Sequence, residues 1–465
     1  MVENSLEPSD NQSSLATSQT CALSGSQQDR VELQTLDPNI THQDWIGRDA
    51  NVVWHGFTQM HHYKDNNPVI ASRGAGRYIF DVDGNKYLDA ISSLWVVTLG
   101  HALSELNKAL FDQANRISHA TMLGNGCDTT VRLAELLSEL VPVNDPKFLF
   151  ASDGASAVEQ ALKIAFQYWK NIDIEGHDKF IALKGAYHGD TVGAMSVSDS
   201  GFYGDTFNPL KFETIFCEDL YEMADYIRDC PDGLAGAIVE PLVQAASGIQ
   251  LNDSLGLLSL SSACNQMSIP LIVDEIATGF GRTGSLFASQ EAGIRPDIMC
   301  LGKAMTGGYL PMSATVVSAR IANSFLGPDL SKRTLFHGHT FGGNALAAAV
   351  AIEHLKLFDS YNVLANVKER SIQLHDALET IARQRPVVKE VRTKGLFAGI
   401  ELNCDEFGDP LLARKVCAKS IEYGVILRSI GSTVTTVPIL TSSQDEIDRI
   451  AWTIGDAIDQ IVNQG

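Results

Sequence analysis

Three features that would assign the chain to a specialised class are absent from its sequence. No apolar run approaches the roughly 18 residues of a membrane-spanning helix, so we expect no membrane partner. The N-terminus lacks a basic segment followed by an apolar core, so we expect no secretion signal. The formal net charge is −21 and no basic stripe is present, which argues against a nucleic-acid partner.

The cysteines show no recognisable pattern. Eight of them are scattered along the chain, and none belongs to a Cys-x-x-Cys pair. This spacing argues against a zinc site and against a disulfide framework, so we expect no metal. Reduced thiols are typical of the cytoplasm, and we therefore expect a cytoplasmic protein.

The composition that is present describes a large globular protein. The 465 residues, 45% hydrophobic and 20% charged, can bury a sizeable core and form two structural domains. Residues 1–44 are rich in Ser, Gln, Asn, Asp and Glu, and we expect a disordered or loosely attached tail there. The N-terminal part of a small domain is predicted at 45–91, a large cofactor-binding domain at 92–359, and the C-terminal part of the small domain at 360–465.

Short apolar strands alternate with helical segments from about residue 148 to 320. The strand candidates are Phe148–Ala151, Phe180–Leu183, Ala237–Val239, Leu271–Val273, Ile298–Leu301 and Ala314–Val317. Such alternation predicts an α/β layer with a mainly parallel sheet that helices cover on both faces. Ligands bind beyond the carboxyl ends of such strands. Asp153, Glu240 and Asp274 fall at these ends, so we expect them to share one crevice.

The two ends of the chain are expected to form a smaller α+β domain. The segment Tyr78–Asp89 contains two strand-like runs around an Asp-Gly turn, which is a hairpin signal. After residue 360 a long charged helix precedes a strand pair, and a second helix ends near Gly424. The closing helix opens with a capping box, Ser443-Gln-Asp-Glu446.

Lys303 carries the strongest indication of chemistry. It follows the apolar run Ile298–Leu301 and precedes glycines, which is typical of a buried strand that delivers a side chain to a loop. Asp274 ends another buried strand, where an unpartnered carboxylate would be costly. Gly154 and Ala155 open a helix whose free amides can hold a phosphate. A lysine for covalent attachment, an aspartate for the ring nitrogen and a phosphate cradle are what pyridoxal 5'-phosphate (PLP) requires.

Three other residues have both an ordinary and a functional interpretation. Tyr187 follows the second predicted strand, where it either stacks on a pyridine face or simply occupies a strand exit. His188 is interpreted as a buried structural histidine rather than a general base. Glu240 either lines the pocket, pairs with an arginine, or merely caps a loop.

Two arginines are candidate anion sites. Arg428 lies on the otherwise apolar run Gly424–Arg428, and its planar fork matches a carboxylate, the ordinary alternative being a surface salt bridge. Arg282, in a glycine-rich stretch, is the second candidate. The run from Phe336 to Asn344 is either an ordinary glycine-rich loop or a donor of a hydroxyl and an amide to a phosphate, in its own chain or in a partner subunit.

In combination these residues resemble the class III (ω-amino-acid) family of fold type I PLP-dependent aminotransferases. The resemblance covers residue 45 to the C-terminus and rests on Tyr187-His-Gly, Asp274-Glu-Ile-Ala-Thr-Gly-Phe-Gly-Arg-Thr-Gly284, Lys303 and Thr340-Phe-Gly-Gly-Asn. It implies a large domain with a mainly parallel seven-stranded sheet and a smaller α+β domain. It also implies PLP as cofactor, a small-molecule amino donor, a keto-acid acceptor, and a homodimer with shared active sites.

The same resemblance implies a role for each site residue. Lys303 would be the catalytic residue. The implied cofactor-binding residues are Gly154, Ala155, Tyr187, Asp274, His339 and Thr340. The implied substrate-binding residues are Phe57, Leu94, Tyr187, Lys303, Gly338 and Arg428. Among them, Arg428 would take the carboxylate of the keto acid.

Within the family, further short motifs resemble those of a branch that aminates 7-keto-8-aminopelargonate. These motifs are Trp54-His-Gly-Phe-Thr-Gln-Met60, Ser92-Ser-Leu-Trp95, Ala165-Phe-Gln-Tyr-Trp169, Tyr187-His-Gly-Asp-Thr191, Ala194-Met-Ser-Val197 and His337-Gly-His-Thr340. Phe57, Leu94 and His339 stand where members that use S-adenosylmethionine commonly have Tyr, Trp and Pro. The amino donor is therefore lysine or S-adenosylmethionine, and these replacements favour lysine.

Two other functions remain to be distinguished. Another class III aminotransferase, acting on a diamine or an ω-amino acid, would share Lys303 and Asp274 and differ only in its pocket. A PLP-binding regulatory protein is a non-enzyme alternative. The presence of both Lys303 and Asp274, and a polar N-terminal tail unlike a DNA-binding module, argue against it.

Overall fold

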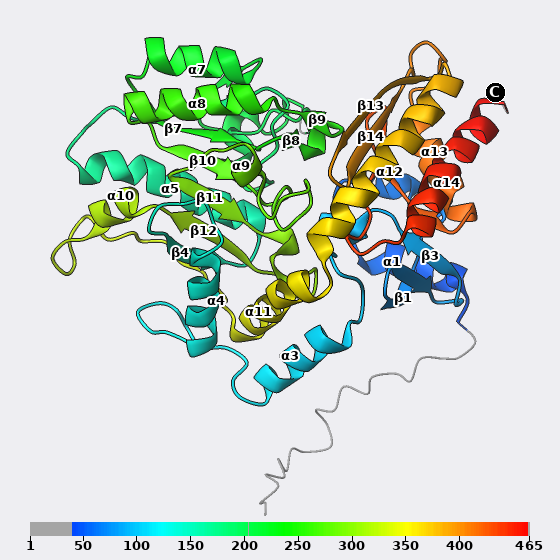
Figure 1. The fold of residues 1–465 in the computed structure, drawn as a ribbon, viewed down its shortest axis with the longest axis horizontal. Helices are drawn as coiled ribbons and strands as arrows, with labels where there is room; N and C mark the ends of the chain where they lie inside the picture. Colours follow the sequence, from blue (N-terminus) through cyan, green and yellow to red (C-terminus); the bar gives the residue numbers. More distant parts are fainter. Residues whose placement is uncertain (1–39, 203, 464–465) are drawn as a thin grey trace, which may run out of the picture.

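The computed structural model describes residues 40–202 and 204–463, and it consists of a large α/β part and a smaller α+β part (Figure 1). Most of the predicted tail, residues 1–39, lies outside the described residues. Helix α1 (His42–Val52) begins inside the stretch that the sequence assigned to the tail. It begins there because Thr41 and Asp44 cap its first turn reciprocally.

The large part is built on a seven-stranded sheet, as the resemblance implied. The strand order is β4-β12-β11-β10-β7-β5-β6, and β12 alone runs antiparallel to its neighbours. The strands are β4 (Lys147–Ala151), β5 (Lys179–Leu183), β6 (Thr214–Cys217), β7 (Leu234–Val239), β10 (Leu271–Asp274), β11 (Ile298–Leu301) and β12 (Ser313–Val317). The mainly parallel sheet is confirmed. Strand β6 was missed because it lies at the edge and only its last residue is fully buried, so its apolar signal is weak.

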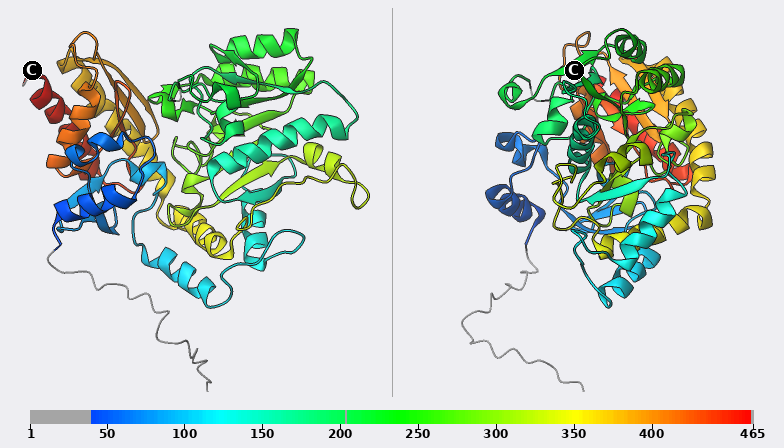
Figure 2. Two further views of the ribbon diagram at one scale, coloured as in Figure 1. Left: turned by 180° about the vertical axis from the view of Figure 1, so that it is seen from behind. Right: turned by 90° about the vertical axis from the view of Figure 1, so that its left-hand side faces the viewer.

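Helices cover both faces of this sheet (Figure 2). Alternate residues of β11 show the two faces: Ile298 and Cys300 belong to one hydrophobic cluster, Met299 and Leu301 to the other. Buried side chains of α5 (Gly154–Asn171), α7 (Leu220–Asp229) and α8 (Ser254–Met267) belong to the first cluster. Buried side chains of α3 (Ser104–Ala114), α4 (Asp128–Ser138) and α11 (Ala345–Ser360) belong to the second.

The smaller part combines both ends of the described chain, seen in Figure 1 as blue beside orange and red. One sheet has the order β1-β2-β3-β15 and the other β13-β14-β17-β16. Their strands are β1 (Ala71–Ala75), β2 (Tyr78–Asp81), β3 (Lys86–Asp89), β13 (Val388–Lys394), β14 (Phe397–Leu402), β15 (Val425–Ile426), β16 (Arg428–Ile430) and β17 (Thr433–Thr436). The predicted hairpin is confirmed as the antiparallel pair β2–β3, and Leu88 of β3 pairs with Val425 of β15 in parallel.

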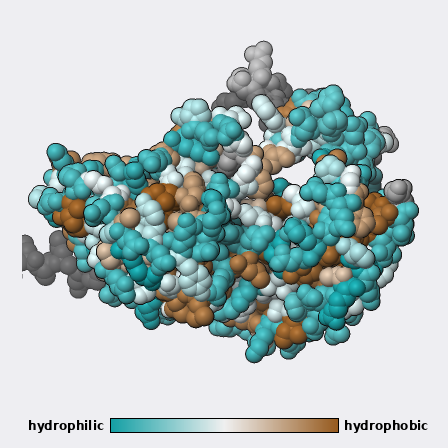
Figure 3. Space-filling model, turned by 90° about the horizontal axis from the view of Figure 1, so that it is seen from above, coloured by the Kyte–Doolittle hydropathy of each residue, from teal (hydrophilic) through white to brown (hydrophobic). Residues whose placement is uncertain are grey.

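Three helices pack on the sheets of the smaller part: α12 (Val363–Gln384), α13 (Leu412–Glu422) and α14 (Gln444–Val462). The predicted capping box is confirmed, because Ser443 and Glu446 cap α14 reciprocally. None of the described helices has the length and apolarity to cross a membrane. Seen from above, the surface is largely hydrophilic with separate hydrophobic patches (Figure 3).

A short strained turn follows β3 and leads into the large part. It comprises α2 (Ser92–Trp95), which is not a regular helix because Ser93 and Leu94 have non-helical backbone angles. Ser92, Ser93 and Trp95 have φ values of 51°, 61° and 63°. Such left-handed conformations are unfavourable for residues with a Cβ and cost on the order of 1–3 kcal/mol each.

We expect Ser443→Ala to destabilise the protein by about 1 kcal/mol, because it leaves a helix N–H of α14 without its capping oxygen. The free energy of unfolding from urea titration measures the change. Ser262→Ala, which removes an exposed hydroxyl from the interior of α8, is the control and should be close to neutral. Equal stability of the two variants would contradict the capping role.

Candidate active site

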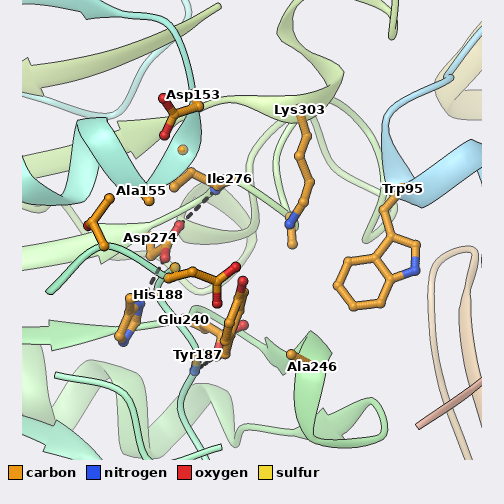
Figure 4. Close-up of a pocket in the computed structure, with 15 residues that line it drawn as sticks. Trp95, Asp153, Ala155, Tyr187, His188, Glu240, Ala246, Asp274, Ile276 and Lys303 are labelled. Atoms are coloured by element: carbon orange, nitrogen blue, oxygen red, sulfur yellow. Dashed lines mark hydrogen bonds and ion pairs between the residues drawn. The ribbon is translucent and has the colours of Figure 1, made fainter. Parts of the chain in front are cut away.

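A cavity of about 440 Å³ opens at the carboxyl ends of the parallel strands. Its lining comes from the start of α5 and from the loops that follow β5, β7, β10 and β11, with Trp95 added from the strained turn. Asp153, Glu240 and Asp274, expected in one crevice, all line it. Figure 4 shows the side chain of Lys303 extending into the cavity between Trp95 and these carboxylates.

Lys303 reaches the cavity because β11 ends at Leu301 and the chain turns sharply. Gly302 is followed by a short 3-10 turn, Lys303–Thr306, and Lys303 itself has φ 40°. Burial lowers the pKa of the Lys303 amine, whereas the carboxylates of Asp274 and Glu240 raise it. Burial therefore makes the neutral form of the amine, which a nucleophile or a base requires, more accessible than it is in water.

Asp274 is held at the end of β10 by two donors. The backbone N–H of Ile276 donates to Oδ1 at 3.0 Å, and Nδ1 of His188 lies 2.8 Å from Oδ2. Asp274 is 5% exposed and His188 is 2% exposed, so this pair is shielded from water. Nε2 of His188 is buried without a hydrogen-bond partner. The imidazole and the Ile276 N–H thus fix the orientation of the carboxylate, and Asp274 lines the cavity.

Tyr187 and Glu240 form the wall near Asp274 (Figure 4). The backbone N–H groups of Tyr187 and Ala245 donate to the two oxygens of Glu240, each at 3.1 Å. Burial raises the pKa of Glu240 to about 7, and the nearby charge of His188 opposes this shift. Burial also raises the pKa of Tyr187, with Asp190 adding to the effect, so the phenol stays neutral. Glu240 has no arginine partner among the described residues; it lines the pocket and also caps loop amides, so both of these interpretations agree with the structure.

The start of α5 offers free backbone amides to the cavity. Asp153 caps the helix by accepting the N–H of Ser156 at 2.9 Å, which leaves the amides of Gly154 and Ala155 unused by that cap. A Cβ on Gly154 would come within 2.9 Å of Ile276 Cγ2. A Cβ on Gly189 would come within 2.5 Å of the Ala155 Cβ. These close approaches require glycine and leave room for an anion at the positive end of the helix.

Aromatic residues surround the outer part of the cavity. The ring of Phe202 lies 6.0 Å from that of Tyr187 and 5.8 Å from that of Phe57, both edge to face. Phe57 is 63% exposed, so it belongs to the rim rather than to the cavity. The Lys303 amine lies 5.0 Å from the centre of the Trp95 ring. Leu94, next to Trp95, is half-exposed and does not line the cavity.

The remaining residues named from the sequence do not line this cavity in the described part of the chain. Gly338, His339 and Thr340 lie on the connection that leads into α11, where Gly338 and Thr340 are exposed. Nε2 of His339 lies 3.2 Å from Nε2 of His337. Arg428 is exposed on β16, and its backbone carbonyl accepts the hydroxyl of Thr435.

Arg282 is not an anion site, contrary to the prediction. Its side chain is 1% exposed, and it donates to the carbonyl of Pro438 and to Oγ of Ser92. Burial lowers the pKa of Arg282 to about 9. A guanidinium enclosed between the two parts of the molecule stabilises their contact and cannot meet a ligand.

Three contributors to the site were not assigned by sequence reasoning. His188 was interpreted as structural, and its contact with Asp274 depends on two strands that are distant in the chain. Trp95 is part of the motif Ser92-Ser-Leu-Trp95, but no function in the site was assigned to it from the sequence. Phe202 lies in a loop without a periodic pattern, so no signal in the sequence would have found it.

The residues present fit PLP by chemistry and by shape. The cavity has an amine of lowered pKa, a buried carboxylate oriented by His188, and glycines where a Cβ would fill the cradle. Lys303 can hold the aldehyde carbon, Asp274 can face the ring nitrogen, and the amides at α5 can face the phosphate. No group of three or more His, Cys, Asp or Glu in the described residues could hold a metal ion.

Comparison with known proteins gives one family. A model of the class III aminotransferases matches residues 59–458. The adenosylmethionine-8-amino-7-oxononanoate aminotransferase of Staphylococcus aureus is 38% identical over 442 residues, which cover 90% of this chain and 98% of that protein. The crystal structure of the enzyme with the same name from Methanocaldococcus jannaschii has a TM-score of 0.85 and 35% identity, covering 90% and 98% of the two chains. An omega-transaminase from Thermomicrobium roseum has a TM-score of 0.83 and 29% identity, covering 90% and 99%.

We expect Asp274→Asn to lower the pKa of Lys303 further, because it removes a carboxylate that raises it while burial remains. The pKa is measured by NMR titration of 13C-methylated lysines in protein freed of cofactor, with Lys303→Arg assigning the signal. Asp178→Asn removes a surface charge outside the cavity and should leave that signal unchanged. A rise in the pKa of Lys303 in Asp274→Asn would contradict the electrostatic account.

Proposed function

Because the chain belongs to the class III aminotransferase family, whose cofactor is PLP, we propose that it transfers an amino group to 8-amino-7-oxononanoate (7-keto-8-aminopelargonate). The product is 7,8-diaminopelargonate, an intermediate of biotin biosynthesis. The observation that carries this proposal is the level of identity. Relatives named for this reaction are 31 to 38% identical over about 90% of the chain, whereas the neighbours named as other transaminases are 26 to 30% identical.

The cavity residues divide the binding of the cofactor among them. When bound, PLP withdraws electrons from the carbon that carries the amino group of the substrate. Asp274 would keep the ring nitrogen protonated, because a buried carboxylate oriented by His188 stabilises a proton at that position. Gly154 and Ala155 would hold the phosphate through backbone amides at the start of α5. Tyr187 would offer the ring a neutral phenol to pack against.

Lys303 would have two roles, attachment of the cofactor and proton transfer. Its amine would hold the cofactor, and Nζ, when not bound to the cofactor, would take the proton from the carbon that bears the substrate amino group. Nζ must be neutral for that transfer. Burial lowers the pKa of the amine and so makes the neutral form more accessible, and Trp95 lies beside the amine on one side.

Residues outside the cavity lining bind the substrates. Arg428 takes the carboxylate of the keto acid, because its fork provides two parallel N–H donors. Phe57 and Leu94 offer apolar contact to the chain of either substrate. The ring of Phe202 contacts both Phe57 and Tyr187, so it connects this apolar surface with the cavity. These contacts orient the substrate so that its reacting carbon approaches Lys303.

The active protein is a homodimer with shared active sites. Gly338, His339 and Thr340 lie outside the cavity of their own chain, on an exposed connection. Large apolar side chains flank this connection and are exposed: Leu123 61%, Phe336 75% and Phe341 62%. A partner subunit would bury these side chains and bring Thr340 and His339 to the phosphate of its neighbour, with Gly338 at the substrate.

The protein acts in the cytoplasm. Every cysteine among the described residues is a free thiol, and most of them are buried. Cysteines that are unpaired and dispersed in this way suit a reducing compartment. Biosynthetic substrates of low molecular mass are available there.

The direct test is turnover of purified holo-protein with 8-amino-7-oxononanoate and a range of amino donors. We expect 7,8-diaminopelargonate by mass spectrometry. Lys303→Ala should remain folded, retain PLP only non-covalently and lose transamination. Diamines and ω-amino acids are tested in parallel, with pyruvate as acceptor. Turnover with these pairs and none with 8-amino-7-oxononanoate would assign the chain to another class III aminotransferase.

We expect Arg428→Ala to reduce kcat/KM for the keto acid by about 10- to 100-fold, since a charged bidentate contact contributes roughly 1.5–3 kcal/mol. The loss should appear mainly in KM, with an unchanged cofactor spectrum. Arg414→Ala, an exposed arginine bonded to Asn66, is the control and should keep the KM of the parent. Unchanged KM in Arg428→Ala would move the carboxylate site to another residue.

The donor is lysine or S-adenosylmethionine, and we expect lysine to react faster. A sulfonium is a large cation that aromatic faces attract. Leu94 stands where a second tryptophan would offer such a face, and Phe57 lacks a hydroxyl. Stopped-flow half-reactions with each donor, following conversion of the cofactor absorbance, give the second-order rate constants. A faster reaction with S-adenosylmethionine would contradict the predicted preference for lysine and leave the proposed acceptor unaffected.

A further inference from the structure

One buried carboxylate outside the cavity holds the backbone that carries a wall of the cavity. Asp89 is the last residue of β3, and it is 1% exposed. Both of its oxygens accept the backbone N–H of Ser93, at 2.9 and 2.7 Å. The imidazole Nε2 of His101 lies 2.9 Å from Oδ2. The carboxylate is therefore buried together with a partner that can carry the opposite charge.

The backbone that Asp89 holds is strained. Ser93 has φ 61° and ψ −72°, a combination that residues with a Cβ rarely adopt. Its neighbours Ser92 and Trp95 also have positive φ. A turn with this much strain persists only where surrounding bonds determine its conformation, and strain of this kind is found at functional sites.

The strained turn ends at a residue of the cavity. Trp95 packs its ring edge to face on Phe397, with centroids 5.9 Å apart, and the Lys303 amine lies 5.0 Å from its ring centre. A second anchor holds the start of the turn, where the hydroxyl of Ser92 donates to the carbonyl of Val437 at 2.6 Å. Between these two anchored ends, the backbone N–H of Ser93 donates to Asp89.

We propose that Asp89, paired with His101, is a positioning residue that keeps the turn Ser92–Trp95 in its strained conformation. It thereby fixes Trp95 beside Lys303 and sets the place of Leu94 at the rim. This role follows from the geometry of the turn alone, so it does not depend on which keto acid or donor the enzyme uses. Asp89 acts through the turn and makes no contact with the cavity itself.

The chain offers a matched control on the same hairpin. Asp81, at the end of β2, is 3% exposed and accepts hydrogen bonds from the N–H of Asn85 and the hydroxyl of Tyr87. It is a buried carboxylate that organises backbone, as Asp89 is, but it has no contact with the strained turn. Asp81→Asn therefore weakens hydrogen bonds to the turn of the hairpin, whereas Asp89→Asn weakens those to the strained turn Ser92–Trp95.

In holo-protein we expect Asp89→Asn to lower kcat/KM for the amino donor and the amino acceptor by about 10²-fold, as misplacement of a site wall does. The loss should lie mainly in KM, because Lys303 and Asp274 are unchanged. Asp81→Asn should retain the KM values of the parent. In protein freed of cofactor, the amides of residues 91–97 should exchange hydrogen faster in Asp89→Asn and at the parent rate in Asp81→Asn.

A suppressor separates positioning from stability. Glycine adopts the φ of Ser93 without steric cost, so Ser93→Gly should restore most of the KM and the amide protection that Asp89→Asn loses. Ser93 is exposed, and Ser93→Gly alone should behave as the parent. His101→Gln, which keeps the carboxylate and removes its charged partner, should give a smaller loss in the same direction and serves if Asp89→Asn does not fold.

Three results would each overturn the proposal. One is normal KM and normal amide protection of residues 91–97 in Asp89→Asn or, if that variant does not fold, in His101→Gln. Another is an equal loss of kcat/KM in Asp81→Asn and Asp89→Asn, which would show that stability alone is affected. The third is a double variant, Asp89→Asn with Ser93→Gly, that is no better than Asp89→Asn. If the parent protein showed no activity with the proposed acceptor, the proposed function would fail. The positioning role would still be tested, because the hydrogen-exchange measurement needs no substrate.

Discussion

The removal of one amine and its carboxylate partners from water is the constraint on which the site depends. Lys303, Asp274 and Glu240 share a cavity in which burial disfavours the charged forms of Lys303 and Glu240, so the three groups depend on one another and on fixed backbone donors. His188 orients Asp274, and the amides of Tyr187 and Ala245 hold Glu240. These donors lie in the connections that follow β5 and β7, and the strands of the sheet fix the points from which those connections start.

The large sheet could be predicted because its signals are local. Short runs such as Ile298–Leu301 are apolar throughout, and each is followed by the polar or glycine residue that ends it. The carboxyl ends of parallel strands meet at one edge, so placing the strands also places Asp274, Glu240 and Lys303 together. The capping box at Ser443 is equally local, and it marks the start of α14 correctly.

The features that sequence reasoning missed depend on contacts between distant segments. Arg282 is a candidate anion site in sequence, but Pro438 and Ser92 enclose it, and neither neighbour can be foreseen from the residues around it. The contact of His188 with Asp274 likewise joins two strands that are remote in the chain. The places of Phe57, Gly338, Thr340 and Arg428 outside the cavity lining follow from loop paths, for which the sequence has no periodic signal.

The pairing of β3 with β15 has a consequence for the order in which the protein can be made. Strand β3 gains its neighbour on one side only when Val425 of β15 has been synthesised and pairs with Leu88. Until then the hairpin β2–β3 has an unpaired strand edge. The turn that carries Trp95 follows directly on this strand, and it also needs Val437. Contacts of such long sequence separation form late. The large sheet can therefore assemble during synthesis, whereas the cavity gains its Trp95 wall only when the chain is almost complete.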